Sequence, residues 1–219
     1  GHITSTFKDA LIYGLAGVLG KAAGFIMLPV YAHYLRGEGY GIVSMIDVVL
    51  SALGVLIGYG ISGAMRRFYF QKDSDDLKNV FISTNITLMI ILVTCITLPT
   101  LVFADPIALL AFGKAGLGHY LVLGMITFIF NTSGVNAENY ILIRQKSLLF
   151  SILSLAKLIV GLSLNIYFVV MLEKGVLGFL YSNLITGMLF AVIAHAYVYY
   201  LVGFHFNALD AKEILQDHN

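Results

Sequence analysis

Four ionisable side chains interrupt long apolar stretches of this sequence: Lys21, Asp47, Glu138 and Lys157. A charge that faces hydrocarbon costs a few kcal/mol, so such residues in a membrane face the interior of a helix bundle or a water-filled cavity. At 1.5 Å per residue, Lys21 lies about 16 Å into its stretch, and its depth differs from that of Asp47 by roughly 4 Å. Lys157 lies within reach of Glu138 by the same measure. The sequence therefore predicts two charge pairs, which serve either a substrate path or only the register of the helices.

Small and polar residues share helical faces with these charges, because residues three and four apart lie on one side of a helix. Lys21 shares its face with Gly17, Gly24 and Leu28, which predicts close approach to another helix. Two further faces, on consecutive helices, are polar and predict a hydrated path between them. They comprise Asn131, Gly134, Glu138 and Gln145 on one helix, and Ser154, Lys157, Gly161 and Asn165 on the next.

Three other polar residues lie inside apolar stretches. His195 is a candidate for the substrate path, although it could also simply bond to a neighbouring residue. Asn136 and Asn139 are predicted to make hydrogen bonds between helices. The sequence shows no metal-ligand spacing, phosphate loop, CxxC pair or nucleophile elbow, so we expect neither an enzyme nor a bound cofactor or metal.

The elements that position these residues are predicted from composition. Hydrophobic residues make up 59% of the 219 residues and charged residues only 11%, whereas a soluble domain carries about 25% charged residues. The mean hydropathy is +0.89, so lipid is the expected solvent. A net charge of +1 gives no reason to expect a nucleic-acid partner. A helix needs about 20 residues to cross the hydrocarbon core. We predict an all-α bundle of six transmembrane helices, over Ala10–Leu35, Tyr40–Gly63, Val80–Phe103, His119–Ile143, Leu148–Met171 and Val176–Val202.

Lysine and arginine set the expected orientation of this six-helix lobe, residues 1–203. Eight of these residues fall in segments on one side of the membrane and three on the other, which predicts that the richer side, with both chain ends, is cytoplasmic. Residues 204–219 are predicted to be an interfacial helix or a linker, with a partner-binding helix as the alternative. The chain begins Gly1-His2, without an initiating Met, which we interpret as a cloning scar or as a piece of a longer protein.

An ordered set of short motifs resembles a known family. They are Tyr13-Gly14 through Gly20-Lys21 to Leu28-Pro29-Val30-Tyr31, then Gly37-Glu38-Gly39-Tyr40-Gly41, Gly58-Tyr59-Gly60-Ile61-Ser62-Gly63-Ala64 and Arg66-Arg67-Phe68-Tyr69-Phe70. Together they are similar to Wzx-type polysaccharide flippases, the polysaccharide-transporter branch of the multidrug/oligosaccharidyl-lipid/polysaccharide (MOP) exporter superfamily. The resemblance is strongest over residues 7–80 and beyond them is mainly one of hydropathy.

The resemblance implies that the chain moves an undecaprenyl-diphosphate-linked repeat unit across the inner membrane for surface polysaccharide biosynthesis. Family members have two similar six-helix halves around a central cavity, and helix 1 of each half lines it. This chain matches the N-terminal half, so a C-terminal half is an expected partner beside membrane lipid and lipid-linked oligosaccharide. The resemblance implies that Lys21, and after it Lys157, contacts the phosphate or sugar acid, while Asp47 and Glu138 act as counter-charges or ion sites.

Three other functions remain open from the sequence. A cation-coupled multidrug exporter of the same superfamily would favour acidic cavity residues, but the buried charges are two of each sign. A membrane-embedded glycosyltransferase or polymerase would have long outer loops with carboxylates, and the loops predicted here are short. A non-transporting membrane scaffold would pair its buried charges and leave no cavity.

Overall fold

The computed structural model describes residue 18, residues 22–114 and residues 116–216, without the side chains of residues 56, 58 and 59. Over this part the regular elements are helical. They are α2 (Arg36–Tyr69), α3 (Asp75–Val102), α4 (Ala104–Phe112), α5 (Gly118–Ile143), α6 (Ser147–Asn165), the π-helix η1 (Ile166–Met171), α7 (Gly175–Val202) and α8 (Ala208–Gln216). Residues 22–34 are helical as well, and we refer to them as helix 22–34.

Five helices of the described part are long and apolar enough to cross a membrane: α2, α3, α5, α6 continued by η1 over Ser147–Met171, and α7. The prediction of an all-α membrane bundle is therefore confirmed. Of the first predicted span, Ala10–Leu35, the described residues include only residue 18 and the stretch from residue 22 onward. Lys21 lies outside the described residues, so its predicted pairing with Asp47 stays a prediction.

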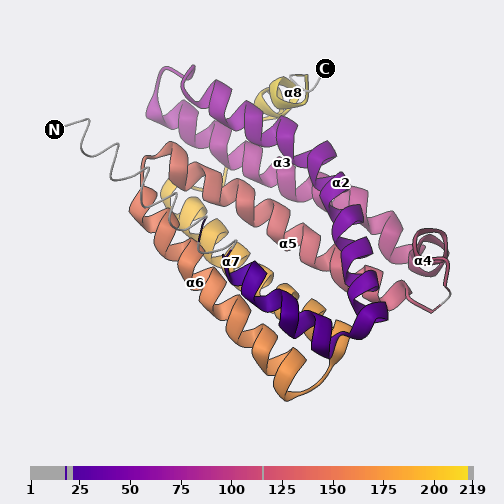
Figure 1. Ribbon diagram of the computed structural model, residues 1–219. Helices are drawn as coiled ribbons and strands as arrows, with labels where there is room; N and C mark the ends of the chain where they lie inside the picture. Colours follow the sequence, from indigo (N-terminus) through magenta and orange to yellow (C-terminus); the bar gives the residue numbers. More distant parts are fainter. Residues whose placement is uncertain (1–17, 19–21, 115, 217–219) are drawn as a thin grey trace.

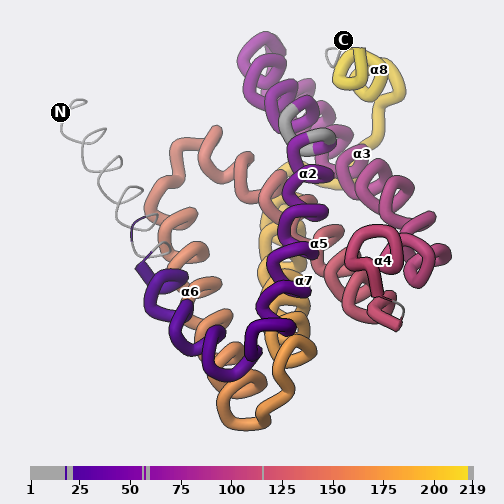
Figure 2. The backbone as a smooth tube through the Cα atoms, turned by 45° about the vertical axis from the view of Figure 1, so that its right-hand side comes forward, coloured from indigo at the N-terminus to yellow at the C-terminus, as the bar shows by residue number. Residues whose placement is uncertain are grey.

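The long helices run alternately in opposite directions (Figure 1). The turns after α2 and after α5 lie at one end of the bundle, which we call the basic end because Arg66, Lys72, Arg144 and Lys146 lie there. Helix α4 and the turn between η1 and α7 lie at the opposite end. Helices α5 and α7 run through the middle of the bundle in both views (Figures 1 and 2).

Close packing of α5 on α7 depends on a small residue. A Cβ atom added to Gly134 would lie 3.1 Å from the Cβ and 3.2 Å from the Cα of Ala191, so a larger residue would push the two helices apart. Without a hydrophobic driving force between helices, such close contacts between small residues supply much of the association in lipid.

The first turn differs from the prediction. Residues 36–39, expected to form a loop, are the first residues of α2, and the chain reverses at Arg36, whose φ is 56° (Figure 2). Gly39 is instead a contact residue, because a Cβ atom there would lie 3.0 Å from a methyl carbon of Val176 in α7. A glycine that permits close packing of two helices thus lies in the segment that the predicted spans left between helices.

The predicted loop 104–118 also contains a helix, α4. Pro106 is compatible with this helix, because proline is tolerated in the first turn, where its missing N–H has no intrahelical partner. Asp105 carries a negative charge in the same turn, which the helix dipole favours. Gly113, with φ of 68°, ends the helix in the left-handed conformation that glycine adopts without strain.

Candidate functional site

A cavity of about 440 Å³ lies among helix 22–34, α5, α6 and α7. Helix 22–34 contributes the row Ala23, Met27 and Tyr31, with Gly24 beside it. Leu28, which was predicted to share the face of Lys21 and Gly24, lines a separate surface groove with Phe25 and Pro29. The cavity is therefore the place where the predicted polar faces can be compared with the structure.

The polar face predicted for the fifth span lines this cavity along its whole length. Ser154, Lys157, Gly161 and Asn165 of α6 all border it. From α5, Asn131 borders the same space. The structure thus brings two of the predicted path residues, Asn131 and Lys157, to one cavity within helices that can cross a membrane.

The predicted pair of Lys157 and Glu138 forms, with Lys157 Nζ 3.5 Å from Glu138 Oε1. The two side chains are 26% and 13% exposed, so both charges are largely removed from solvent. An ammonium group has three donor hydrogens, and the one directed at Glu138 leaves the others free to serve a ligand or water. Since Lys157 also lines the cavity, its charge is available there while Glu138 balances it from α5.

A contact between two residues that line the cavity joins helix 22–34 to α6. The Tyr31 hydroxyl donates to Asn165 Oδ1 over 3.2 Å, and Asn165 Nδ2 donates to the Gly161 carbonyl over 3.0 Å. The Tyr31 ring also packs edge-on against Phe179 of α7, with ring centroids 5.3 Å apart. Sequence reasoning named Tyr31 within a motif of the family resemblance and missed this role.

Helix α7 contributes three residues that sequence reasoning missed: Asn183, Thr186 and Gly187. Thr186 and Gly187 follow Asn183 by three and four residues, so the three lie on one face of the helix. The search for polar residues at this spacing, which found the faces of the two preceding spans, would also have found this one. Gly187 supports Asn131, because a Cβ atom at Gly187 would lie 2.7 Å from Asn131 Oδ1. The position of the Asn131 amide in the cavity thus depends on a glycine in the facing helix.

The remaining two predicted path residues lie elsewhere. Asp47 is an exposed residue of α2 and is not among the described residues that line the cavity. His195 lines a second cavity, of about 340 Å³, between α3, α5 and α7. Its Nδ1 lies 2.6 Å from the Ala191 carbonyl oxygen and therefore carries the hydrogen, as the alternative prediction of a bond to a neighbour required.

Buried asparagines hold α2, α3 and α5 together on the other side of the bundle. The Ser62 hydroxyl donates to Asn136 Oδ1, and Asn136 Nδ2 donates to Asn85 Oδ1, both over 3.0 Å. Asn85 Nδ2 completes the chain by donating to the Ile61 carbonyl over 3.1 Å. Asn139 accepts a hydrogen bond from Arg66 over 3.2 Å. The predicted role of Asn136 and Asn139 in interhelical bonding is confirmed.

Among the described residues, no group of three or more His, Cys, Asp or Glu side chains is placed to hold a metal ion. The chemistry of the first cavity is therefore that of one ammonium group, several amides and hydroxyls, and a carboxylate that compensates the ammonium. Such a set can bind an anionic and hydroxylated molecule by hydrogen bonds and charge.

Comparison with known proteins gives the family. A family model described as "Polysaccharide biosynthesis protein" matches residues 6–216. The chain belongs to this family. The resemblance of the first helices to a polysaccharide family is thus confirmed. A search of curated proteins gives no match.

Among solved structures, this family member is similar to a MOP superfamily transporter from Pyrococcus furiosus, whose description reports a binding pocket of reversed polarity and infers a different function. The TM-score is 0.73 and the sequence identity 18%. The match covers 99% of this chain and 49% of that transporter, so the chain spans about half the length of the solved structure.

Proposed function

We propose that this chain is one half of a transporter that moves a lipid-linked oligosaccharide, an undecaprenyl-diphosphate-linked repeat unit, across the inner membrane for surface polysaccharide biosynthesis. The observation that carries the proposal is the cavity beside Lys157, in which a cationic group and several amides lie within membrane-crossing helices. The family and the fold support a transporter. The missing C-terminal half would complete the path from the opposite side.

The three parts of the proposed substrate need different surroundings. Its diphosphate needs a positive charge and hydrogen-bond donors, and Lys157 supplies the charge. Its sugars need polar partners of the kind that Asn131, Asn183 and Thr186 offer. Its polyprenyl tail stays in the lipid. Lys21, three residues before Gly24 in the sequence, is the second cation that we assign to the headgroup, with Asp47 as its counter-charge.

Orientation follows from the distribution of charge. The basic end of the bundle faces the cytoplasm, because cytoplasmic segments carry an excess of lysine and arginine. The contact of Tyr31 with Asn165 then lies at the outer end of the cavity. In this arrangement the headgroup enters from the cytoplasmic side, and rocking of this half against its partner opens the outer end.

The rival functions fit the cavity less well. An exporter of organic cations needs a carboxylate free to bind them, whereas Glu138 is paired with Lys157 and the lysine is the residue that lines the cavity. A scaffold needs paired charges without an accessible space, and here a cavity of about 440 Å³ adjoins the pair.

The test is export of surface polysaccharide by the full-length protein in cells that lack it. We expect Lys157→Ala and Lys21→Ala to lower export strongly at normal protein levels, and Lys157→Arg to retain more export than Lys157→Ala. Lys174→Ala, which removes an exposed lysine just before α7, serves as the control and should export normally. Normal export from Lys157→Ala would refute the headgroup role.

A further inference from the structure

A third cavity lies among α2, α3 and α8, apart from the polar cavity. It has a volume of about 260 Å³, and helix α2 contributes Leu53, Ile57 and Ile61 to its wall. Helix α3 contributes Leu92 and Ile96. Every lining side chain that the structure describes is aliphatic, and an apolar cavity of this kind binds apolar molecules in preference to water.

The cavity is elongated along the helices. Leu53, Ile57 and Ile61 follow one another at intervals of four residues, and eight residues of helix rise about 12 Å. The long axis of the space therefore runs with α2 and α3, from the level of α8 toward the middle of the bilayer. The long axis of the space thus has the direction and depth of an acyl chain that extends inward from the cytoplasmic surface.

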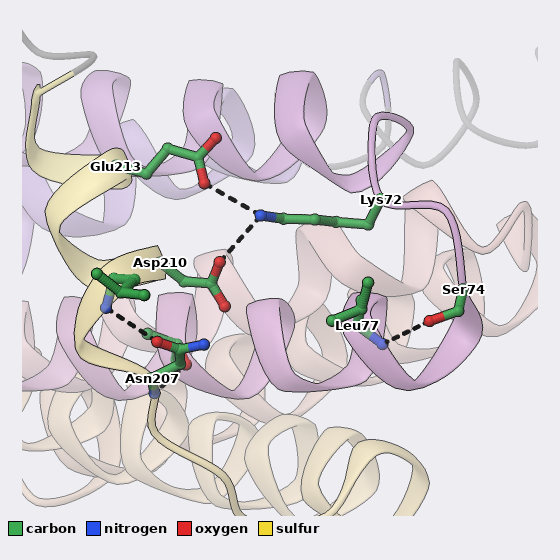
Figure 3. Close-up of polar contacts among 8 residues, drawn as sticks. Lys72, Ser74, Leu77, Asn207, Asp210 and Glu213 are labelled. Carbon is green, nitrogen blue, oxygen red and sulfur yellow. Dashed lines mark hydrogen bonds and ion pairs between the residues drawn. The ribbon is translucent and has the colours of Figure 1, made fainter.

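Helix α8 covers the end of the cavity nearest the basic end, through Ile214 and Leu215. Its polar face is fixed by Lys72, whose Nζ lies 2.9 Å from Asp210 Oδ1 and 3.0 Å from Glu213 Oε2 (Figure 3). A helix with charged groups on one face and aliphatic groups on the other is suited to lie in the membrane interface.

The segment that precedes α8 is attached at a defined level of α3. The backbone N–H groups of His205 and Asn207 donate to the hydroxyls of Ser83 and Thr84, over 2.8 and 3.0 Å. Asn207 in turn accepts a hydrogen bond from the N–H of Leu209 in α8 over 2.9 Å (Figure 3). The cover is therefore held in place by hydrogen bonds as well as by ion pairs.

Two described lining residues are exposed, Ile96 of α3 at 44% and Leu215 of α8 at 43%, while Ile214 is buried. Lys212 precedes Leu215 by three residues and so lies on the same face of α8, and it is exposed. A chain that enters at Leu215 would leave its headgroup beside the Lys212 ammonium, which favours an anionic lipid.

We propose that this space is a binding site for one acyl chain of an anionic phospholipid from the cytoplasmic leaflet, with its phosphate at Lys212. The site is separate from the polar cavity and does not depend on the transported substrate. Bound lipid would join α8 to α2 and α3 and would thereby fix the segment that leads out of the lobe.

The test uses the whole chain, stripped of lipid in detergent and then titrated with dioleoylphosphatidylglycerol, with bound lipid counted by native mass spectrometry. We expect one tightly bound molecule per chain. Leu92→Trp fills the cavity and should weaken binding about tenfold or more. Ile91→Trp makes the same substitution at the adjacent residue, which is 45% exposed and does not line the cavity, and it should bind as the unchanged chain does.

Lys212→Gln leaves the cavity intact and tests the headgroup contact even if Leu92→Trp fails to fold. We expect it to lose the preference for dioleoylphosphatidylglycerol over dioleoylphosphatidylcholine. The proposal is overturned if the unchanged chain binds neither lipid, if folded Leu92→Trp binds as well as Ile91→Trp, or if Lys212→Gln keeps the preference. Displacement of the phospholipid by undecaprenyl phosphate at equal concentration would assign the space to an isoprenoid chain, and this result would also overturn the proposal.

Discussion

Replacement of Glu138 by glutamine tests the electrostatic arrangement of the polar cavity. Glutamine keeps the shape of the side chain but removes the charge that faces Lys157 Nζ at 3.5 Å. Lys157 would then hold an uncompensated ammonium group among helices that cross a membrane. We therefore expect Glu138→Gln to destabilise the bundle.

The magnitude follows from burial. Removal of one partner from a buried ion pair costs about 3–5 kcal/mol, because the other charge stays buried without compensation. Lys157 is 26% exposed and borders the cavity, so water relieves part of this cost and we expect about 2–3 kcal/mol. For a chain of 150–250 residues, each kcal/mol lowers Tm by about 2–4 °C, which gives a decrease of roughly 4–12 °C.

Thermal unfolding of the purified chain in detergent, followed by its helical circular dichroism, measures this decrease. The exchanged variant Glu138→Lys with Lys157→Glu keeps both charges and should recover most of the lost stability. A double-mutant cycle with Lys157→Met isolates the coupling between the two side chains. An unchanged Tm in Glu138→Gln, together with a coupling energy near zero, would refute the argument that this pair sets the charge balance of the cavity.

Two further outcomes are expected. Gly187→Ala should lower the free energy of unfolding by about 1–3 kcal/mol, because the added Cβ would lie 2.7 Å from the Asn131 amide and overpack the contact. Gly24→Ala should leave stability unchanged, because an added Cβ there has nothing within 4 Å. The Tm of each variant measures these effects. Lys72→Met should release α8 at a cost of about 1–3 kcal/mol, seen as faster hydrogen exchange over residues 208–216. Burial alone would lower the pKa of Lys72, but its hydrogen bonds to the two carboxylates of α8 outweigh burial and raise the pKa. The stabilisation is therefore complete at neutral pH and is lost as pH rises through this raised pKa. Lys78→Met should change little, because Asp75, the partner of Lys78, is exposed.

Much of the polar cavity could be predicted from periodicity. The face of Ser154, Lys157, Gly161 and Asn165 was found because polar residues three and four apart stand out in an apolar helix. The pair of Lys157 with Glu138 followed from depth, since a charge in lipid requires a partner within reach.

Other features depend on contacts that periodicity does not reveal. Whether His195 faces the first cavity or the second depends on the rotation of α7, and its sequence neighbours are apolar on every side. The path of the chain at Arg36 depends on how closely Gly39 can approach α7. Attachment of α8 depends on Lys72, which lies more than 130 residues earlier in the sequence. A contact between residues so far apart in the sequence cannot be predicted from a local pattern.

The central claim is that a water-accessible cavity lies within the membrane between helix 22–34, α5, α6 and α7. Cysteine accessibility tests it most directly, after the single native cysteine, Cys95, is replaced by serine. Ser154→Cys adds a thiol on the cavity side of α6, and Ile159→Cys adds one to the same helix at a position that is 63% exposed and lies outside the cavity lining. In reconstituted membranes, a charged, membrane-impermeant maleimide should label Ser154→Cys much faster than Ile159→Cys. Equal protection of both thiols, or faster labelling of Ile159→Cys, would contradict the account.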